Sequence, residues 1–232
     1  MAVNSFVAQK KKLLKEFDTL VKRIHRVFLL RFGEEKTEIM IAEAREEYEK
    51  LIPQLPWVGG GQPFTQFVIA TGWFLAMYHS LKQHGVQQDE VGQMFFDSSK
   101  AYIESYPGFM LKLMGHINFS ERYLMKLQEK ALESHLRQYP GGYVFNFITG
   151  DGKTFDYGVD YLECASCKFL KAQGAMEIAP YLCAIDQLYS EKFGWGLSRT
   201  MTLAEGYEKC DFRFKKGGMT NIRLPAGLRI YN

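Results

Sequence analysis

Apolar side chains recur at steps of three and four residues through most of the first 138 positions, which is the spacing of amphipathic helices. The first stripe begins at Phe6, and Gly33 is suited to the C-cap where this helix ends. Clusters of Pro and Gly interrupt the later pattern and mark turns. The pattern predicts five helices, over residues 6–33, 34–51, 63–83, 89–105 and 118–137.

The periodicity changes after residue 142. Residues 143–149 (YVFNFIT) alternate, an Asp/Gly turn follows at 150–153, and residues 155–161 form a second alternating run, which together predict a hairpin. Beyond the hairpin, the pattern predicts two further helices and two further strands. These cover residues 161–173, 178–192, 197–203 and 211–215.

This order of elements indicates an α+β fold. Helices come first and strands are gathered later in the chain, whereas an α/β protein would alternate them. We therefore expect a helical region over residues 1–138 and an α+β region over residues 139–232. In the second region, an antiparallel sheet should have helices packed on one face. The two regions are expected to form one compact unit.

Composition narrows the possible partners. The chain has 29 basic and 26 acidic residues, a balance that does not favour nucleic-acid binding. Its N-terminus lacks the order of a secretory signal. The longest apolar stretch, residues 67–78, is shorter than the ~20 residues of a membrane-spanning helix. We expect a soluble cytoplasmic protein with no membrane partner, whose cysteines are reduced thiols.

All four cysteines lie after residue 163, and Cys164 and Cys167 form a C-x-x-C motif. A structural metal site is one interpretation, but Cys183 and Cys210 stand alone, without the paired spacing of zinc ribbons. A thioredoxin-like redox pair is another, although that motif belongs to a βαβ context that this sequence lacks. Small buried thiols are the third, which we prefer for Cys164. We expect no metal and no cofactor.

Cys183 and Asp186 are three residues apart, so on one helix they would share a face. A neighbouring carboxylate raises a thiol pKa, because like charges oppose ionisation. A nucleophilic Cys183 therefore needs a cation, and Arg199 is a candidate. Alternatively, Asp186 is a general base that activates water while Cys183 lines the pocket.

Residues 210–214 (CDFRF) alternate as a strand. Cys210 and Phe212 should lie on one face, and Asp211 and Arg213 on the other, where they can form a surface ion pair. All five histidines lie in the helical region, outside any recognisable metal or catalytic motif. A Cys–His dyad between the two regions remains an open alternative.

Several features between about Glu163 and Lys216 occur in a recognisable order. They are Cys167, Gly174-Ala175 with Glu177, Pro180, Cys183-x-x-Asp186, Arg199-Thr200-x-Thr202-Leu203, Gly206 and Cys210-Asp211-Phe212-Arg213-Phe214. This succession resembles the L-2-amino-thiazoline-4-carboxylic acid hydrolase family, which the helical half fits only loosely. The stretch around Gly206 and Cys210 is also similar, at the level of fold, to 4-vinyl-reductase-type small-molecule-binding domains.

The resemblance implies a hydrolase that opens a cyclic C–N/C–S small molecule, such as 2-amino-thiazoline-4-carboxylate, to N-carbamoyl-L-cysteine. It implies roles as nucleophile, base or orienter for four residues, Cys183, Asp186, Cys210 and Asp211. It implies substrate binding by four others, Arg199, Thr202, Cys167 and Glu177. Arg199 has a guanidinium suited to a carboxylate, and Thr202 can donate a hydrogen bond.

The expected partner is therefore a small-molecule substrate, and assembly into a homo-oligomer stays open. Two alternatives to the hydrolase remain. One is a non-catalytic protein that binds a small planar or hydrophobic ligand in an aromatic cavity, which 18 Phe and 13 Tyr make plausible. The other is a Cys-ligated metal protein.

Overall fold

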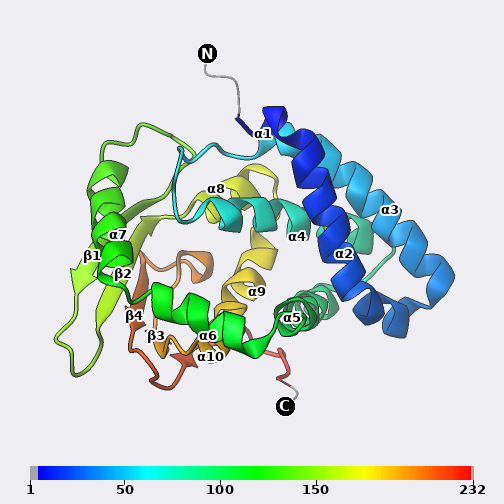
Figure 1. Cartoon of the computed structure of the whole chain (residues 1–232). Helices are drawn as coiled ribbons and strands as arrows, with labels where there is room; N and C mark the ends of the chain where they lie inside the picture. Colours follow the sequence, from blue (N-terminus) through cyan, green and yellow to red (C-terminus); the bar gives the residue numbers. More distant parts are fainter. Residues whose placement is uncertain (1–4, 231–232) are drawn as a thin grey trace.

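The computed structural model describes residues 5–230 and has the α+β architecture that the sequence predicts (Figure 1). The N-terminal half is helical, with α1 (Ser5–Ala8), α2 (Lys10–Phe32), α3 (Glu34–Leu51), α4 (Thr65–Gln83), α5 (Gln88–Glu104), α6 (Gly108–Ile117) and α7 (Glu121–Ser134). The rest contains β1 (Val144–Thr149), β2 (Tyr157–Glu163), α8 (Ala165–Ala172), α9 (Ala179–Ala184), α10 (Asp186–Phe193), β3 (Leu197–Arg199), β4 (Cys210–Phe214) and β5 (Asn221–Ile222). Short 3-10 helices are η1 (Ile52–Gln54), η2 (Met176–Ile178) and η3 (Leu203–Glu205).

The five helices predicted for the N-terminal half are present, with shifted ends. The last of them, α7, begins later than expected because Ser120 is its N-cap and accepts a hydrogen bond from the Tyr123 amide. Helix α6 was not predicted. It starts directly after Pro107 and buries only Leu111 and Gly115, so its apolar residues are not confined to one inward stripe.

The sheet has the strand order β1-β2-β4-β3-β5. The pairs β1–β2, β2–β4 and β3–β4 are antiparallel, as expected. The pair β3–β5 is parallel, so the sheet is mixed at one edge. Strand β5 has only two residues, Asn221 and Ile222, which is too short for an alternating pattern to be visible in the sequence.

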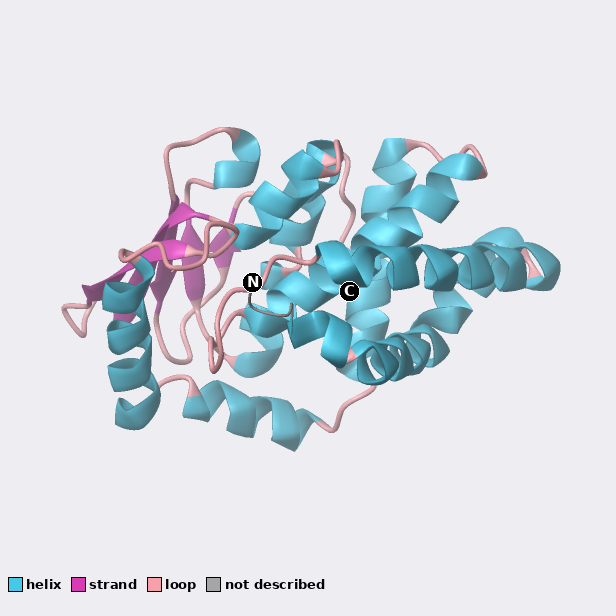
Figure 2. Ribbon diagram, turned by 90° about the horizontal axis from the view of Figure 1, so that it is seen from above, coloured by secondary structure: helices cyan, strands magenta, loops and turns pink. Residues whose placement is uncertain are grey.

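The two faces of the sheet differ in chemistry. The strand register places Phe145, Tyr161, Phe212 and other aromatic residues together on one side, which we call the inner face. These residues pack with α7, through side chains such as Leu127. The opposite side, the outer face, carries Asp160 and residues that pair with it. Viewed from above, the sheet lies at one end of the molecule and most helices lie at the other (Figure 2).

The largest core cluster joins the two halves of the chain. It combines residues of α2, α3 and α5, such as Phe17, Tyr48 and Phe95, with Phe169 of α8 and Ile178 of η2. The division into residues 1–138 and 139–232 stays a prediction, but both parts contribute to this one core. Within residues 5–230, no helix combines the length and apolar character needed to cross a lipid bilayer.

Three local differences from the predicted elements affect the site. Strand β2 continues to Glu163, so the next helix starts only at Ala165, and Cys164 lies between them. The helix predicted over 178–192 is divided into η2, α9 and α10, with Ile185 between the last two. The strand predicted over 197–203 ends at Arg199, because the Thr202 side chain caps η3.

Candidate active site

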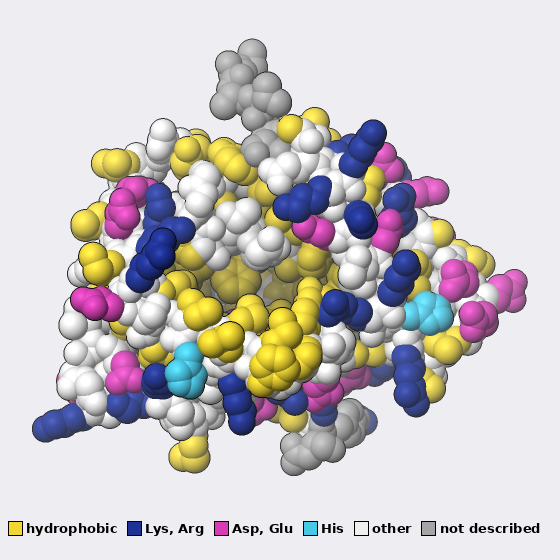
Figure 3. All heavy atoms as spheres, viewed as in Figure 1, with side chains coloured by type: hydrophobic (Ala, Val, Ile, Leu, Met, Phe, Trp, Pro, Cys, Tyr) yellow, Lys and Arg dark blue, Asp and Glu magenta, His cyan; other side chains and the backbone are white. Residues whose placement is uncertain are grey.

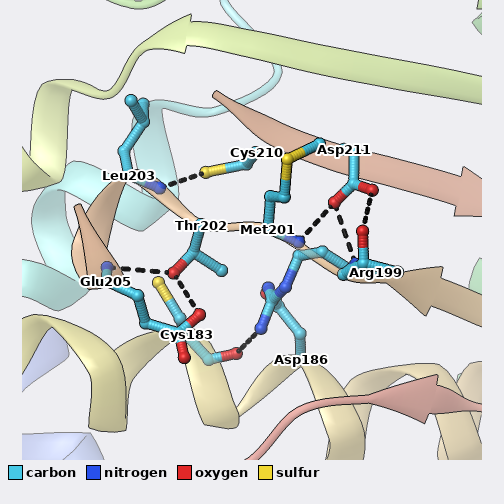
Figure 4. A network of polar contacts seen from close by, with 10 residues as sticks. Cys183, Asp186, Arg199, Met201, Thr202, Leu203, Glu205, Cys210 and Asp211 are labelled. Carbon is cyan, nitrogen blue, oxygen red and sulfur yellow. Dashed lines mark hydrogen bonds and ion pairs between the residues drawn. The ribbon is translucent and has the colours of Figure 1, made fainter. Parts of the chain in front are cut away.

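Arg199, Asp186 and Cys183 converge at the end of strand β3 (Figure 4). The Arg199 side chain is 2% exposed, and its Nη1 donates to Asp186 Oδ2 at 2.5 Å. Its Nη2 donates to the Cys183 carbonyl oxygen at 3.0 Å, and the guanidinium lies 4.9 Å from the ring centroid of Phe212. The guanidinium is thus already paired. It anchors Asp186 and α9, and it would bind a substrate carboxylate only by leaving Asp186.

Asp186 keeps an accessible edge, since its side chain is 23% exposed. Burial raises the pKa of this carboxyl above its usual value, although the ion pair with Arg199 opposes the shift. A carboxylate with a raised pKa and an accessible edge is suited to accept a proton from water or substrate. The prediction of Asp186 as a base is therefore chemically reasonable in this geometry.

The thiol of Cys183 is not activated in this arrangement. Burial raises its pKa well above the usual range, Asp186, Cys164 and Cys210 raise it further, and Arg199 lowers it. Arg199 thus acts in the direction that the sequence suggested, but its effect is smaller than that of burial. Cys183 is a neutral thiol near neutral pH.

Cys164 is the one cysteine of the four whose pKa is lowered. It occupies the N-cap position of α8, directly after β2. A hydrogen bond from the Cys167 thiol lowers its pKa, burial opposes this, and the amides of Cys167 and Ser166 together with the Ser166 hydroxyl lower it further. Free amides at a helix N-terminus stabilise a thiolate in this way.

The interpretation of Cys164 as a small buried thiol did not include its N-cap position or its lowered pKa. The available signal was the C-x-x-C motif at the junction of a strand and a helix. A helix over residues 161–173, as the periodicity predicts, would place Cys164 inside it and away from the free amides of the N-terminus.

The side chains of Cys167 and Ser166 lower the pKa of Cys164. Hydrogen bonding to Cys164 and burial raise the pKa of Cys167, so this thiol keeps its proton and donates it. The Ser166 hydroxyl is hydrogen bonded to the Thr71 hydroxyl at 2.8 Å and to the Tyr143 hydroxyl at 3.2 Å. Residues from α4 and from the start of the hairpin therefore hold the first turn of α8 in place.

Four side chains of the site are neither fully exposed nor fully buried. Cys164, Cys167, Cys183 and Asp186 all keep some accessible surface, yet burial raises the pKa of Cys183 and Asp186. Figure 3 shows a central hollow with hydrophobic side chains around it, in the region that α4, α6, α7 and α9 frame in Figure 1.

Cys210 and Thr202 stabilise the loop beside the site (Figure 4). Cys210 lies on the inner face, as predicted, where its sulfur accepts a hydrogen bond from the Leu203 amide at 3.2 Å, and burial raises its pKa to about 12. The Thr202 hydroxyl donates to the Glu205 carboxylate at 2.8 Å and accepts from the Glu205 amide at 3.2 Å. Both side chains are committed to the turn between β3 and β4.

Asp211 and Glu177 are not brought together with Arg199. Asp211 points to the outer face, as the alternation predicts, and accepts hydrogen bonds from the amides of Thr200 at 2.9 Å and Met201 at 2.7 Å. The Glu177 carboxylate accepts a hydrogen bond from the Tyr78 hydroxyl of α4 at 2.5 Å. Their proposed catalytic and substrate-binding roles stay predictions, and the contacts of both side chains stabilise local structure.

The histidines have partners other than cysteine. His25, His79, His84 and His135 contact Glu38, Glu47, Glu43 and Asn146, and His116 contacts the Lys112 carbonyl oxygen. A Cys–His dyad therefore finds no support in these contacts.

Among the described residues, the candidate metal-binding group contains no cysteine. In the described part of the chain, the one group of three side chains with ligand atoms close enough to share an ion is His25, Glu34 and Glu38, at the junction of α2 and α3. No three of the cysteine sulfurs form such a group there. The geometry gives the Cys-ligated metal alternative no support.

The comparison with known families covers most of this site. A family model described as L-2-amino-thiazoline-4-carboxylic acid hydrolase matches residues 66–214. The match runs from α4 to the end of β4, so it extends well before the segment around residues 163–216 that carries the resemblance. No curated protein and no solved structure matches the chain at a significant level.

Proposed function

The chain belongs to the L-2-amino-thiazoline-4-carboxylic acid hydrolase family, and we propose that it opens a cyclic C–N/C–S small molecule such as 2-amino-thiazoline-4-carboxylate to N-carbamoyl-L-cysteine. One observation carries this proposal. Cys164, the one cysteine with a lowered pKa, and the Asp186–Arg199 pair all influence the pKa of Cys183, so these groups lie around the same thiol. A nucleophile and a proton acceptor are the two groups that such a ring opening requires.

The product determines which bond breaks. N-carbamoyl-L-cysteine keeps the ring nitrogen on its carbamoyl carbon and carries a free thiol, so the bond between the ring sulfur and that carbon is cleaved. In our proposal, the Cys164 thiolate attacks this carbon and the ring sulfur leaves as a thiolate that takes up a proton. The substrate is then linked to the protein through a new carbon–sulfur bond.

Water completes the reaction. In the second step, a water molecule attacks the same carbon, Asp186 accepts its proton, and the Cys164 thiolate leaves. One water is consumed in total, and the Cys164 thiolate is regenerated. Arg199 acts as a positioning residue, because it holds the Asp186 carboxylate through their ion pair. The aromatic rings of the inner face, including Tyr161 and Phe212, offer surfaces for a planar ring.

A turnover assay under reducing conditions tests this proposal. We expect the wild type to convert the thiazoline, and Cys164→Ser to lower kcat by about 10³-fold or more. The matched variant Cys183→Ala should change kcat by less than about tenfold. The reverse result would support the sequence-based assignment of Cys183 as nucleophile. Absence of product with the wild type would contradict the activity itself.

The non-catalytic alternative rests on the aromatic inner face, which can bind a planar ligand without reacting. Thiol reactivity separates the two proposals. For the hydrolase, we expect iodoacetamide at about pH 6 to label Cys164 at least about tenfold faster than Cys183 or Cys210. Equal and slow labelling of all cysteines would favour a binding protein.

A further inference from the structure

We propose that Cys164 and Cys167 form a reversible redox pair, which a low-molecular-weight disulfide or a peroxide converts to an intramolecular disulfide at the N-terminus of α8. The formation of this bond does not require hydrolysis. Its consequence, reversible loss of turnover, rests on the proposed function, because a disulfide-bonded Cys164 cannot attack a substrate.

The backbone brings the two sulfurs together. Cys164 is the N-cap of α8 and Cys167 lies in its first turn, so both side chains are near the same helix end. Each thiol shifts the pKa of the other, downward for Cys164 and upward for Cys167, as neighbouring sulfurs do. A disulfide requires neighbouring sulfurs and nearby α-carbons, and a C-x-x-C motif across the first helical turn meets both conditions.

The two thiols have different roles. Cys164, at the N-cap, is the attacking thiol, since its pKa is lowered whereas that of Cys167 is raised. Cys167 keeps its proton until Cys164 has reacted, because its hydrogen bond to the Cys164 sulfur and burial raise its pKa. Attack by one thiolate and resolution by its neighbour is how dithiol pairs exchange electrons.

Cys164 and Cys167 are partly accessible and not fully buried. Cys210, in contrast, is buried and accepts a hydrogen bond from the Leu203 amide. The Cys183 thiol is half-buried, but burial raises its pKa and keeps it protonated. Of the four thiols, Cys164 and Cys167 are thus the two that are partly accessible and adjacent, and the lowered pKa of Cys164 makes it the one that ionises more readily.

The electrons balance with either oxidant. With a disulfide, the Cys164 thiolate attacks one of its sulfurs and displaces the first small thiolate. Cys167, losing its proton, then attacks the Cys164 sulfur and displaces the second. With a peroxide, the Cys164 thiolate is oxidised to a sulfenic acid, and Cys167 displaces water. Each route removes two electrons from the protein, and an added dithiol reverses it.

Mass spectrometry of the whole chain tests this proposal. Trypsin releases residues 154–168 as one peptide that contains both cysteines. After treatment with oxidised glutathione at about pH 7, we expect this peptide to lose the mass of two hydrogens and dithiothreitol to restore it. A peptide of unchanged mass, or a bond that joins Cys164 to Cys183 or Cys210, would overturn the proposal.

Two conservative variants assign the roles. Cys167→Ser lacks the resolving thiol, so it should accumulate a mixed disulfide with glutathione at Cys164. Cys164→Ser should remain largely unmodified in the same peptide. The matched control Cys210→Ala should form the same Cys164–Cys167 bond as the wild type. Glutathione attached mainly to Cys167 in Cys164→Ser, at the wild-type rate, would contradict the assignment of Cys164 as the attacking thiol.

Activity measured on the same samples separates the two proposals. A Cys164–Cys167 bond without turnover in either redox state would leave the redox pair standing and contradict the hydrolase. Turnover by the reduced protein, with residues 154–168 unchanged by the oxidant, would leave the hydrolase standing and contradict the redox pair. If both proposals hold, turnover should fall in proportion to the disulfide and return after reduction.

Discussion

The sheet carries an aspartate–cation cluster on each of its faces, and the pKa values of the two aspartates are shifted in opposite directions. On the outer face, burial raises the pKa of Asp160, but hydrogen bonds from Arg213 at 2.7 Å and Lys209 at 2.6 Å outweigh it, so the pKa is lowered. On the inner face, burial outweighs Arg199, and the pKa of Asp186 is raised. Both carboxylates are ion-paired.

The difference lies in the surroundings of each pair. Asp160 has two cations, whose side chains are 26% and 35% exposed and stay hydrated. Asp186 has one cation, which is almost completely buried. The Asp160 side chain is itself only 9% exposed, less than the 23% of Asp186, but its two cations keep much of their hydration, whereas the single cation of Asp186 does not. The outer cluster is therefore suited to holding strands together, and the inner pair to accepting a proton.

Removing each carboxylate should give the largest contrast. Asp186→Ala leaves the Arg199 guanidinium buried and unpaired, so we expect the free energy of unfolding to fall by about 3–5 kcal/mol. Asp160→Ala leaves two cations that water can reach, so we expect a loss of about 1 kcal/mol. Urea unfolding of both variants measures this. Equal losses would mean that the two faces do not differ as described.

Replacing both partners of the inner pair should recover much of that loss. In the double variant Arg199→Met with Asp186→Leu, no buried charge remains, and apolar side chains fill similar volumes. We expect a free energy of unfolding within about 1–2 kcal/mol of the wild type. A double-mutant cycle with the two single variants gives the coupling energy. A double variant as unstable as Asp186→Ala would show that volume, not charge, determines the loss.

The pH dependence of stability should differ in sign between the two aspartates. The folded pKa of Asp160 lies below 3.8, so its stabilisation is present above that value and is lost as the pH falls through the folded pKa. The folded pKa of Asp186 lies above 3.8, so its contribution is present below 3.8 and is lost as the pH rises through the folded pKa.

Urea midpoints between about pH 3 and pH 6 test these signs. We expect Asp160→Asn to reduce the loss of stability in acid by about 1 kcal/mol. Asp186→Asn should instead remove the decrease in the free energy of unfolding that the wild type shows as the pH rises through the folded pKa of Asp186. Parallel pH profiles for the wild type and both variants would contradict the opposite shifts.

Local periodicity was sufficient for much of the fold. The helical stripes, the hairpin and the alternation that separates Cys210 from Asp211 depend on neighbouring residues, and all are present. Features that depend on distant partners were missed. The break at Ile185 divides a continuous helical pattern, and β5 pairs with β3 through only Asn221 and Ile222.

The sequence by itself determined the α+β order and the family, because these follow from local patterns and from a motif along the chain. It named Cys183, Asp186 and Arg199 as candidates, but their convergence is a tertiary contact. Tertiary structure alone decided which thiol has a lowered pKa. The pKa of Cys164 depends on free amides at a helix end and on the Cys167 thiol, whereas that of Cys183 depends on burial. Burial and hydrogen-bond direction are properties of packed atoms, and residue spacing does not specify them.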